Sequence, residues 1–555
     1  MHASLDPADH AAHPERLAAD VDVLVIGAGI TGIYQLYRAL DAGFSALLVE
    51  AGDGVGGTWY WNRYPGARFD SESYTYGYLF SEELFDEWEW QEHFAPQPET
   101  ERYLNHVVDR FGLRAHIRFG AGVTAAEYEE ESGTWRVTAT NDTDVKARFV
   151  VAATGVLSVP YLPDVPGRDT FGGVAHHTGR WPSEPVDFAG KRVAVIGTSS
   201  SGVQVVPVIA DEVASLTVYQ RTPNWCTPLN NAPITAEEQA RLRAEFEQLR
   251  DVLNTSVHGF HHPAHDRTAF EDPEDERRAF YEKMWNSPGF TKLTSNYLDL
   301  LSNPEANAEW CAFIADKIRG LVHDPETAAR LIPTDHRFGE KRPPFITGYY
   351  EAFNQPKVSL VDLQETPMVR ITSTGIETTD GVREFDIIVW ATGFDFGTGA
   401  LSRMGVRGRD GLPLVEYWAD GPRTFLGVGT HGFPNFFFPG GPHAAAGNNP
   451  RYNGDQVDFV TDLLVYARDH GDDVVEVTAH AEDRWTRMID RGAESPLSFG
   501  EKSYYFGTNI PGKPKRYLLN SAGRPKFFSV AAEVVANDYD AFTLSHASEP
   551  APAGG

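Results

Sequence analysis

The stretch VDVLVIGAGITG, residues 21–32, decides the fold of this chain. Its apolar run at 23–26 is typical of a buried strand in a parallel sheet. Gly27, Gly29 and Gly32 follow at the spacing G-x-G-x-x-G. The first glycine permits a tight turn, the second lets the backbone approach a pyrophosphate, and the third lets the next helix pack on the strand. The stretch therefore predicts the start of a dinucleotide-binding fold.

The residues that follow complete the same unit. We expect a helix at about 30–42 and a second buried strand at 46–49, which ends in Glu50. This acid comes about 20 residues after the first glycine, the distance at which a carboxylate binds the ribose hydroxyls of a dinucleotide. Strand, turn, helix, strand and acid together favour dinucleotide binding over a simple glycine-rich turn.

The stretch KRVAVIGTSSSGVQV, residues 191–205, repeats the pattern. Gly197 and Gly202 hold the first and third glycine positions, but Ser199 occupies the second. A serine leaves less room for a pyrophosphate, although its hydroxyl can bind phosphate oxygens. The next expected strand ends near Arg221, which suits a 2′-phosphate, whereas an acid suits NAD. The alternative for Arg221 is a surface or helix-capping residue.

The composition limits the classes of partner. The formal net charge is −30, so a general field does not attract nucleic acid or an anionic membrane. Cys226 and Cys311 lie far apart, which argues against a disulfide framework, a C-x-x-C redox pair and a cysteine-rich metal site. The first 20 residues lack the apolar run of a signal peptide, and no apolar stretch reaches the length of a membrane span. We expect a cytoplasmic protein.

Between the two turns lies FGGVAHHTGRWP, residues 171–182. Its spacing F-x-G-x-x-x-H-x-x-x-W-P is formed by Phe171, Gly173, His177, Trp181 and Pro182. This pattern resembles the fingerprint of the type I Baeyer–Villiger monooxygenases, flavoproteins that convert ketones into esters or lactones. The resemblance extends over about residues 20–540 and implies an α/β fold with two Rossmann-like doubly wound domains and a helical insertion. It also implies FAD and NADPH as cofactors, and a small-molecule ketone and O₂ as substrates.

The resemblance divides the chain into regions. It implies a flexible arm at 1–20, an FAD-binding domain at 21–160 and 386–540, an NADP-binding domain at 161–232 and 336–385, a helical insertion at 233–335, and a disordered tail at 541–555. Within the first domain we expect a helix near 99–111 and antiparallel strands around 117–119, 134–140 and 147–152. The Ala-Thr-Gly segments at 153–155 and 391–393 resemble the crossings between the two domains.

The stretch GGTWYWNRYPGARFD, residues 56–70, is expected beside the flavin. Its aromatic residues interleave with Arg63, Arg68 and Asp70, charges that a protein core does not tolerate unpaired. A planar ring binds to such a mixture of flat apolar surface and fixed polar groups. The resemblance implies that the cofactors contact Gly27, Gly29, Gly32, Glu50, Gly57, Thr58, Trp59, Asp70, Tyr76, Val123, Asn449, Thr198, Ser199, Ser200, Ser201, Gly202, Gln204, Arg221, Thr222, Lys341, Arg342 and Tyr504.

Arg342 and Asp70 are the expected catalytic residues. In the resembled family the Lys341-Arg342 pair reaches both the NADP phosphate and the flavin. A fixed cation stabilises the negative charge that develops when a ketone carbonyl is attacked, and arginine keeps its charge at any working pH. Asp70 is expected to hold and tune Arg342. The family pattern usually has Trp where this chain has Tyr504.

Two further stretches carry weaker hypotheses. The small residues at 443–447 suggest a roomy pocket for alicyclic ketones. The insertion contains His258, His261, His262 and His265, which we interpret as a solvated loop rather than a metal site, because no partner carboxylates can be identified.

Two other functions remain open at this stage. One is a flavin monooxygenase that oxidises nitrogen or sulfur, and the other is a flavin redox or interaction protein without oxygenating turnover. No metal is expected. A monomer or a weak homo-oligomer is expected.

Overall fold

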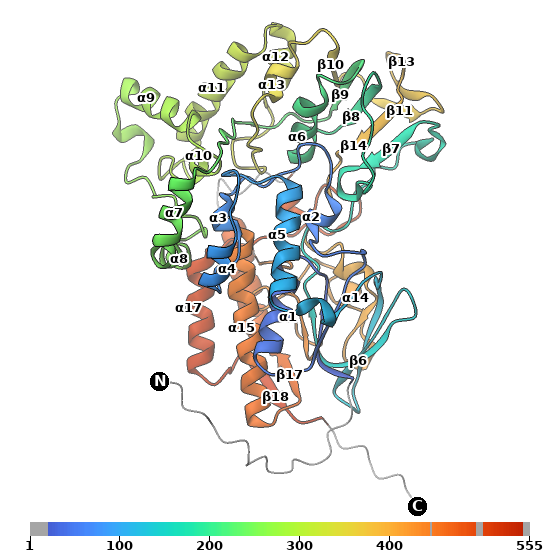
Figure 1. Ribbon diagram of the computed structural model, residues 1–555, viewed down its shortest axis with the longest axis vertical. Coiled ribbons are helices and arrows are strands. Elements are labelled where there is room, and N and C mark those ends of the chain that lie inside the picture. The colour runs from blue at the N-terminus through green and yellow to red at the C-terminus, as the bar shows by residue number, and fades with distance from the viewer. Residues whose placement is uncertain (1–19, 445–446, 495–502, 548–555) are drawn as a thin grey trace, which may run out of the picture.

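The structure is a computed structural model that describes residues 20–444, 447–494 and 503–547 (Figure 1). The expected arm at 1–20 therefore lies almost wholly outside the described residues. Among the described residues, no helix is both long and apolar enough to span a bilayer.

The first sheet has eight strands in the order β15-β4-β5-β6-β1-β2-β3, with β16 beside β6. The strands are β1 Val21–Ile26, β2 Ala46–Val49, β3 Ile117–Arg118, β4 Val123–Glu129, β5 Thr134–Ala139, β6 Asp144–Ala152, β15 Val406–Arg407 and β16 Phe436–Phe437. The predicted strand-turn-helix-strand unit is confirmed, since β1 is parallel to β2 and is followed by α1 (Ile30–Asp41). β1 lies in the middle and also pairs in parallel with β6.

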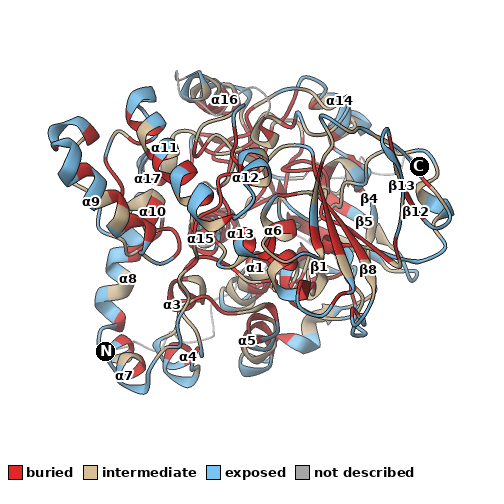
Figure 2. Cartoon of the chain, turned by 90° about the horizontal axis from the view of Figure 1, so that it is seen from above, coloured by how far each residue is buried: buried red, intermediate tan, exposed pale blue. Residues whose placement is uncertain are grey.

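The apolar run of β1 follows from burial on both faces. Val23 and Val25 pack in the cluster that contains α1, whereas Leu24 and Ile26 pack in the cluster on the opposite face. A strand that is covered on both sides needs a continuous apolar run rather than an alternating one. Figure 2 shows the buried strands of this sheet at the centre of the molecule.

One expectation for the strands of this domain is wrong, and one strand was not predicted. β3 pairs in parallel with β2, so the strand expected near 117–119 is not antiparallel. The antiparallel part consists of β4, β5 and β6, and β4 was not expected. Its sequence VTAAEYE is mostly small or polar, so it carries a weak strand signal.

The second sheet has the order β10-β9-β8-β14-β7. Its strands are β7 Val174–His177, β8 Arg192–Ile196, β9 Ser215–Gln220, β10 Val358–Asp362 and β14 Ile387–Trp390, and α6 (Ser200–Ile209) follows β8. All of its pairings are parallel. Val193 and Val195 face one core cluster, and Ala194 and Ile196 face another that includes Ile376.

A three-stranded antiparallel sheet contributes to the second of these clusters. It consists of β11 Met368–Ile371, β12 Gly375–Thr378 and β13 Gly381–Glu384. β14 belongs to the second sheet, so the expected return to the FAD-binding domain at residue 386 is placed too early. The chain leaves the second sheet only after Trp390, at the Ala-Thr-Gly segment.

The remaining helices of the first domain surround its sheet. They are α2 Thr58–Trp61, α3 Ser73–Tyr76, α4 Glu82–Glu87, α5 Gln97–Arg110, α14 Leu414–Tyr417, α15 Asn449–His470, α16 Ala479–Ala493 and α17 Gly523–Ala536. α15 packs on α1, where Tyr34 donates to Asp458 at 2.7 Å and Gln35 to Thr461 at 3.0 Å. The disordered tail was expected at 541–555, but its first residues are ordered. β18 (Phe542–Ser545) pairs with β17 (Val474–Val477). Residues 548–555 lie outside the described residues.

All of residues 233–335 are described, and they form helices without a strand. The helices are α7 Ala236–Ala244, α8 Phe246–Thr255, α9 Glu274–Trp285, α10 Thr291–Thr294, α11 Pro304–Leu321 and α12 Pro325–Leu331, and α13 (Tyr349–Ala352) follows. Leu242 and Phe246 join the core of the first domain, whereas Tyr281 and Trp310 join that of the second. The insertion therefore belongs to both domains, and its helices run from one to the other (Figure 1).

Candidate functional site

The first glycines of the two turns are placed in the same way. Gly27 has a φ of +103° and Gly197 a φ of +113°, which favours glycine in both cases. A Cβ on Gly27 would lie 2.8 Å from the carbonyl oxygen of Ala153, and one on Gly197 would lie 2.3 Å from that of Ala391. Each turn therefore packs against the Ala-Thr-Gly segment of its own domain.

The third glycines let a helix approach the turn. A Cβ on Gly32 would lie 1.8 Å from the carbonyl oxygen of Gly27, and one on Gly202 would lie 2.1 Å from that of Gly197. Neither distance can be relieved by a side-chain movement, because the opposing atoms belong to the backbone. The two turns have the same construction, which is the arrangement of two dinucleotide sites.

Ser199 does not alter this construction. Gly29 and Ser199 are the N-caps of α1 and α6, with φ values of −79° and −89° that any residue adopts. Thr178 donates to the Ser201 hydroxyl at 3.1 Å, which joins the fingerprint to this second turn. The serine at the second position therefore adds a hydroxyl and leaves the backbone as it is in the first turn.

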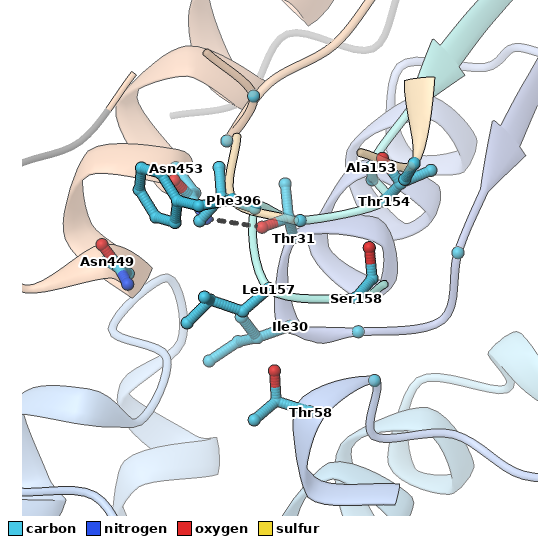
Figure 3. Close-up of a pocket in the computed structure, with 18 of the residues that line it drawn as sticks. Ile30, Thr31, Thr58, Ala153, Thr154, Leu157, Ser158, Phe396, Asn449 and Asn453 are labelled. Atoms are coloured by element: carbon cyan, nitrogen blue, oxygen red, sulfur yellow. Dashed lines mark hydrogen bonds between the residues drawn. The ribbon is translucent and has the colours of Figure 1, made fainter. Parts of the chain in front are cut away.

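A cavity of about 610 Å³ lies along the first turn (Figure 3). Its volume is in the range of small-molecule and cofactor sites. Most of the predicted cofactor residues of the first domain line it, together with Arg342 of the second: Gly27, Gly29, Glu50, Gly57, Thr58, Trp59, Tyr76, Val123, Asn449 and Tyr504. Gly32 and Asp70 are not among the lining residues and lie behind its wall. At one side of the cavity, Asn453 of α15 donates a hydrogen bond of 2.8 Å to the hydroxyl of Thr31 of α1 (Figure 3).

Glu50 shapes the turn as well as lining the cavity. It is 5% exposed, and its two carboxylate oxygens accept from the backbone N–H groups of Ala28 at 2.7 Å and Gly52 at 2.8 Å. A carboxylate offers about four acceptor sites, so lone pairs remain for a ribose hydroxyl. The residues at this end of the cavity fit the adenosine half of FAD.

Aromatic side chains fix the shape of the neighbouring wall. The indole N–H of Trp59 donates to the hydroxyl of Tyr76 at 3.1 Å, and the Tyr76 ring stacks on Phe69 with centroids 4.3 Å apart. This flat surface, next to a fixed cation, fits an isoalloxazine ring.

That cation is Arg342, and Asp70 holds it. The guanidinium donates to the Asp70 carboxylate at 2.5 Å, and Asp70 is 8% exposed. The Phe290 ring lies 5.0 Å from the guanidinium carbon. Burial opposes the charge of Arg342, but the charge and hydrogen bond of Asp70 outweigh it, so the pKa of Arg342 is raised. The two predicted catalytic residues are thus in contact, and Arg342 reaches the cavity.

Lys341 and Arg221 lie on the side of the second domain. The Lys341 ammonium is 3.4 Å from His336 and 3.8 Å from a carboxylate oxygen of Asp335, so it points away from Arg342. Arg221 follows β9 and is exposed. Thr198 donates to the carbonyl oxygen of Thr222 at 2.8 Å and closes the second turn.

The side chain of Gln204 joins the two domains. It accepts from the hydroxyl of Tyr64 at 2.7 Å and donates to the carbonyl oxygen of Arg68 at 3.0 Å. Gln204 was expected to contact a cofactor, but its side-chain amide is hydrogen-bonded to the segment that carries Asp70.

The five fingerprint positions Phe171, Gly173, His177, Trp181 and Pro182 do not line the cavity, although Arg180 of the same stretch does. His177 ends β7, accepts from the N–H of Gly179 at 2.9 Å and packs on the ring of Phe394. Burial lowers the pKa of His177 to about 4, so the ring is neutral. The N–H of Trp181 donates to the carbonyl oxygen of Trp61 in α2 at 3.1 Å. The fingerprint thus fastens the second sheet to the flavin side of the first domain.

Tyr504 begins a single 3₁₀ turn, Tyr504–Phe506, and its ring packs on Phe396 with centroids 5.2 Å apart. It lines the cavity at this position. Residues 445 and 446 of the small-residue loop lie outside the described residues, whereas Ala444 is buried and Gly447 lines the cavity.

The interpretation of the histidines as a solvated loop is wrong for three of them, because His261, His262 and His265 are partly or largely buried, and His258, although exposed, lines the cavity. The side chain of His262 is 4% exposed, and its Nε2 lies 2.7 Å from a carboxylate oxygen of Glu72. His261 lies beside the same carboxylate. The sequence analysis also missed Phe290, Leu293 and Thr294, which line the cavity from the insertion. No local sequence pattern marks these three residues as part of a site, because the cavity is formed by segments that lie far apart in the chain.

Comparison with known proteins gives consistent matches. A family model described as "Pyridine nucleotide-disulphide oxidoreductase" matches residues 24–279. The chain is 42% identical over 538 residues to the 2-oxo-Delta(3)-4,5,5-trimethylcyclopentenylacetyl-CoA monooxygenase of Pseudomonas putida, which covers 95% of this chain and 98% of that protein. It is 39% identical over 529 residues to the cyclopentanone 1,2-monooxygenase of a Comamonas species, over 95% of this chain and 96% of that protein.

Two further matches bear on the cofactors and on the alternatives. The solved structure of OTEMO in complex with FAD and NADP superposes with a TM-score of 0.92 at 42% identity, over 95% of this chain and 100% of that chain. Phenazine N-monooxygenase of Lysobacter antibioticus is 38% identical over 526 residues, which cover 94% of this chain and 97% of that protein.

The two third glycines provide a matched pair of variants. We expect Gly32→Ala to lose FAD, because the added Cβ overlaps the Gly27 backbone and displaces α1. Gly202→Ala is expected to keep FAD and to lower the affinity for NADPH. Flavin absorbance of the purified variants and the NADPH dependence of flavin reduction measure the two effects, with melting curves as the folding control. Equal loss of flavin in both variants would contradict the assignment of the turns.

Arg221 is expected to distinguish NADPH from NADH. Arg221→Ala should raise the KM for NADPH much more than that for NADH, because only NADPH carries the 2′-phosphate. Initial rates with each nucleotide measure this. Equal effects on both nucleotides would show that Arg221 does not contact the 2′-phosphate.

Proposed function

Because the chain belongs to the type I Baeyer–Villiger monooxygenases, we propose that it inserts an oxygen atom beside the carbonyl of alicyclic ketones and that Arg342 is its catalytic cation. The protein is an FAD- and NADPH-dependent enzyme, and its reaction is the Baeyer–Villiger oxidation of ketones to esters or lactones. The choice of ketone and the role of each residue are the proposed parts.

The single observation that carries the catalytic assignment is the ion pair of Arg342 and Asp70 at the wall of the cavity. FAD, when bound, takes electrons from NADPH and activates O₂. Attack on a ketone places negative charge on its oxygen, and a preorganised cation in a site with little water stabilises that charge. Asp70 fixes the guanidinium in place, so Arg342 does not have to reorganise during the reaction.

The cavity wall supports an apolar, ring-shaped substrate. Phe260, Phe290, Leu293 and Leu301 line the cavity from the insertion, and the ring of Phe290 contacts Arg342. The small residue Gly447 also lines the cavity, beside His258 of the insertion. Such a wall binds a saturated ring by burial of apolar surface and leaves the carbonyl as the polar group that faces the cation.

A nitrogen-oxidising monooxygenase is the second candidate, because phenazine N-monooxygenase is 38% identical to this chain. In the oxidation of an amine the nitrogen is the nucleophile and no negative charge develops on a carbonyl oxygen, so no fixed cation is needed there. The ion-paired Arg342 therefore favours oxidation of a ketone.

The proposed substrates are a ketone and O₂. The proposed assembly is a monomer or a weak homo-oligomer.

Removal of Arg342 is expected to separate the two half-reactions. Arg342→Ala should still bind FAD and become reduced by NADPH, whereas lactone formation should fall by about 10²–10³-fold or more, the cost of losing a preorganised oxyanion donor. Asp70→Ala should have a milder effect, because the cation remains but is no longer oriented. Stopped-flow absorbance follows reduction, and chromatography measures the product.

Arg342→Lys is the matched control, because it keeps the charge but loses the planar donor group. We expect it to lie between wild type and Arg342→Ala in product formation. Product formation by Arg342→Ala at a rate near that of wild type would show that the arginine has no catalytic role.

A ketone panel tests the proposed substrate class. We expect alicyclic ketones to give lactones with NADPH consumed in step, because the apolar wall around Arg342 favours a compact ring. Short acyclic ketones are expected to react with a higher KM. A panel in which only short acyclic ketones or only amines are oxidised would contradict the proposal.

A further inference from the structure

A buried acid-histidine pair lies directly behind the wall of the ketone cavity. Glu72 and His262 have side chains that are 3% and 4% exposed, and Nε2 of His262 is 2.7 Å from a carboxylate oxygen of Glu72. Glu72 comes two residues after Asp70 in the first domain, whereas His262 belongs to the insertion. The contact therefore joins the segment that holds the catalytic cation to the segment that encloses the substrate.

The other side of the His262 ring is also fixed. Its Nδ1 lies 2.7 Å from the hydroxyl of Thr294, which in turn lies 3.0 Å from the carbonyl oxygen of Phe290. Phe260 stacks on the His262 ring at an interplanar angle of 3° and packs on Phe290 with centroids 4.8 Å apart. His262 thus holds two separate segments of the insertion in one arrangement.

The residues that His262 contacts form part of the cavity surface. Phe260, Phe290 and Thr294 line the cavity, and the Phe290 ring lies 5.0 Å from the guanidinium carbon of Arg342. Glu72 and His262 are not among the lining residues. A change in either side chain would therefore act on a substrate only through the wall.

Electrostatic interactions stabilise the contact between Glu72 and His262. Burial raises the pKa of Glu72, but the hydrogen bond from His262 and the charges of His262 and His261 outweigh it, so the pKa is lowered. The ionised carboxylate can only accept, so the proton between the two side chains is on Nε2 of His262. A hydrogen bond to an ionised group away from water is stronger than one between neutral groups.

We propose that Glu72 and His262 are positioning residues that hold the apolar wall of the ketone site at a set distance from Arg342. This inference rests on the proposed function, since it assigns the wall to a ketone. The pair acts on substrate affinity and on the orientation of the carbonyl. It is not expected to affect flavin reduction, which requires no ketone.

The same cluster has one other interpretation. Ligand atoms of Glu72, His261 and His262 all lie within 4.8 Å of one another, which is the composition of a divalent metal site. The 2.7 Å contact between Glu72 and His262 is the length of a hydrogen bond and leaves no space for an ion between these atoms. Metal binding is therefore an outcome that the test has to distinguish.

The test compares His262→Ala and Glu72→Ala with wild type in the FAD-bound enzyme. We expect the KM for a ketone that wild type converts to rise roughly tenfold, the change produced by about 1.4 kcal/mol of lost binding. Reduction of the flavin by NADPH without ketone should stay within roughly twofold of wild type, a margin well below the tenfold change. The double variant should raise KM no further than His262→Ala, because that substitution by itself removes the contact with Glu72.

His265→Ala is the matched control. His265 lies in the same segment with a side chain that is 14% exposed, but it packs on Phe280 and Tyr297 and does not line the cavity. We expect its KM for ketone to equal that of wild type even if its melting temperature falls. His262→Gln, which retains an N–H donor, should restore part of the affinity for ketone.

Three results would overturn the inference. One is an unchanged KM in folded His262→Ala while wild type converts ketones, which would leave the proposed function intact. Another is a rise in KM for His265→Ala equal to that for His262→Ala, which would indicate a general effect of stability. The third is stoichiometric zinc in the purified wild type, with EDTA raising KM as much as the variants do. Absence of ketone turnover in wild type would instead contradict the proposed function itself.

Discussion

The ion pair of Asp70 and Arg342 is the contact on which the site depends. Asp70 belongs to the first domain, and Arg342 follows the insertion on the way into the last strands of the second sheet. Their contact at 2.5 Å holds the positive charge of Arg342 beside the cavity of the first domain. Asp70 is buried and Arg342 is partly exposed, so removing Arg342 leaves a buried carboxylate without its partner. The contact of Arg342 with Asp70 therefore also joins the two domains.

Other contacts between the domains come from residues that sequence patterns associate with cofactors. The side chain of Gln204 is hydrogen-bonded to Tyr64 and to the backbone of Arg68. The backbone N–H of the fingerprint residue Trp181 donates to the carbonyl oxygen of Trp61. These contacts end in the segment from 56 to 70, which forms the flavin side of the cavity. A pattern of this kind marks the boundary where two nucleotide domains meet, and a residue within it need not touch a nucleotide.

Local physics explains which parts of this structure could be predicted. The strands before Gly27 and Gly197 were predictable because a strand that is covered on both faces needs a continuous apolar run. The glycine positions were predictable because a helix cannot otherwise reach the turn. The parallel pairing of β3, the membership of β14 in the second sheet and the burial of His262 were not predictable, since each depends on a partner far away in the chain.

The insertion shows why the site could not be assembled from the nucleotide folds alone. Its first helices share the core of the first domain and its later helices share that of the second, so it has to follow any change in their relative position. Phe290 and Leu293 lie in its middle and form part of the cavity wall. A wall that is carried by both domains can surround a substrate only while the domains are correctly placed.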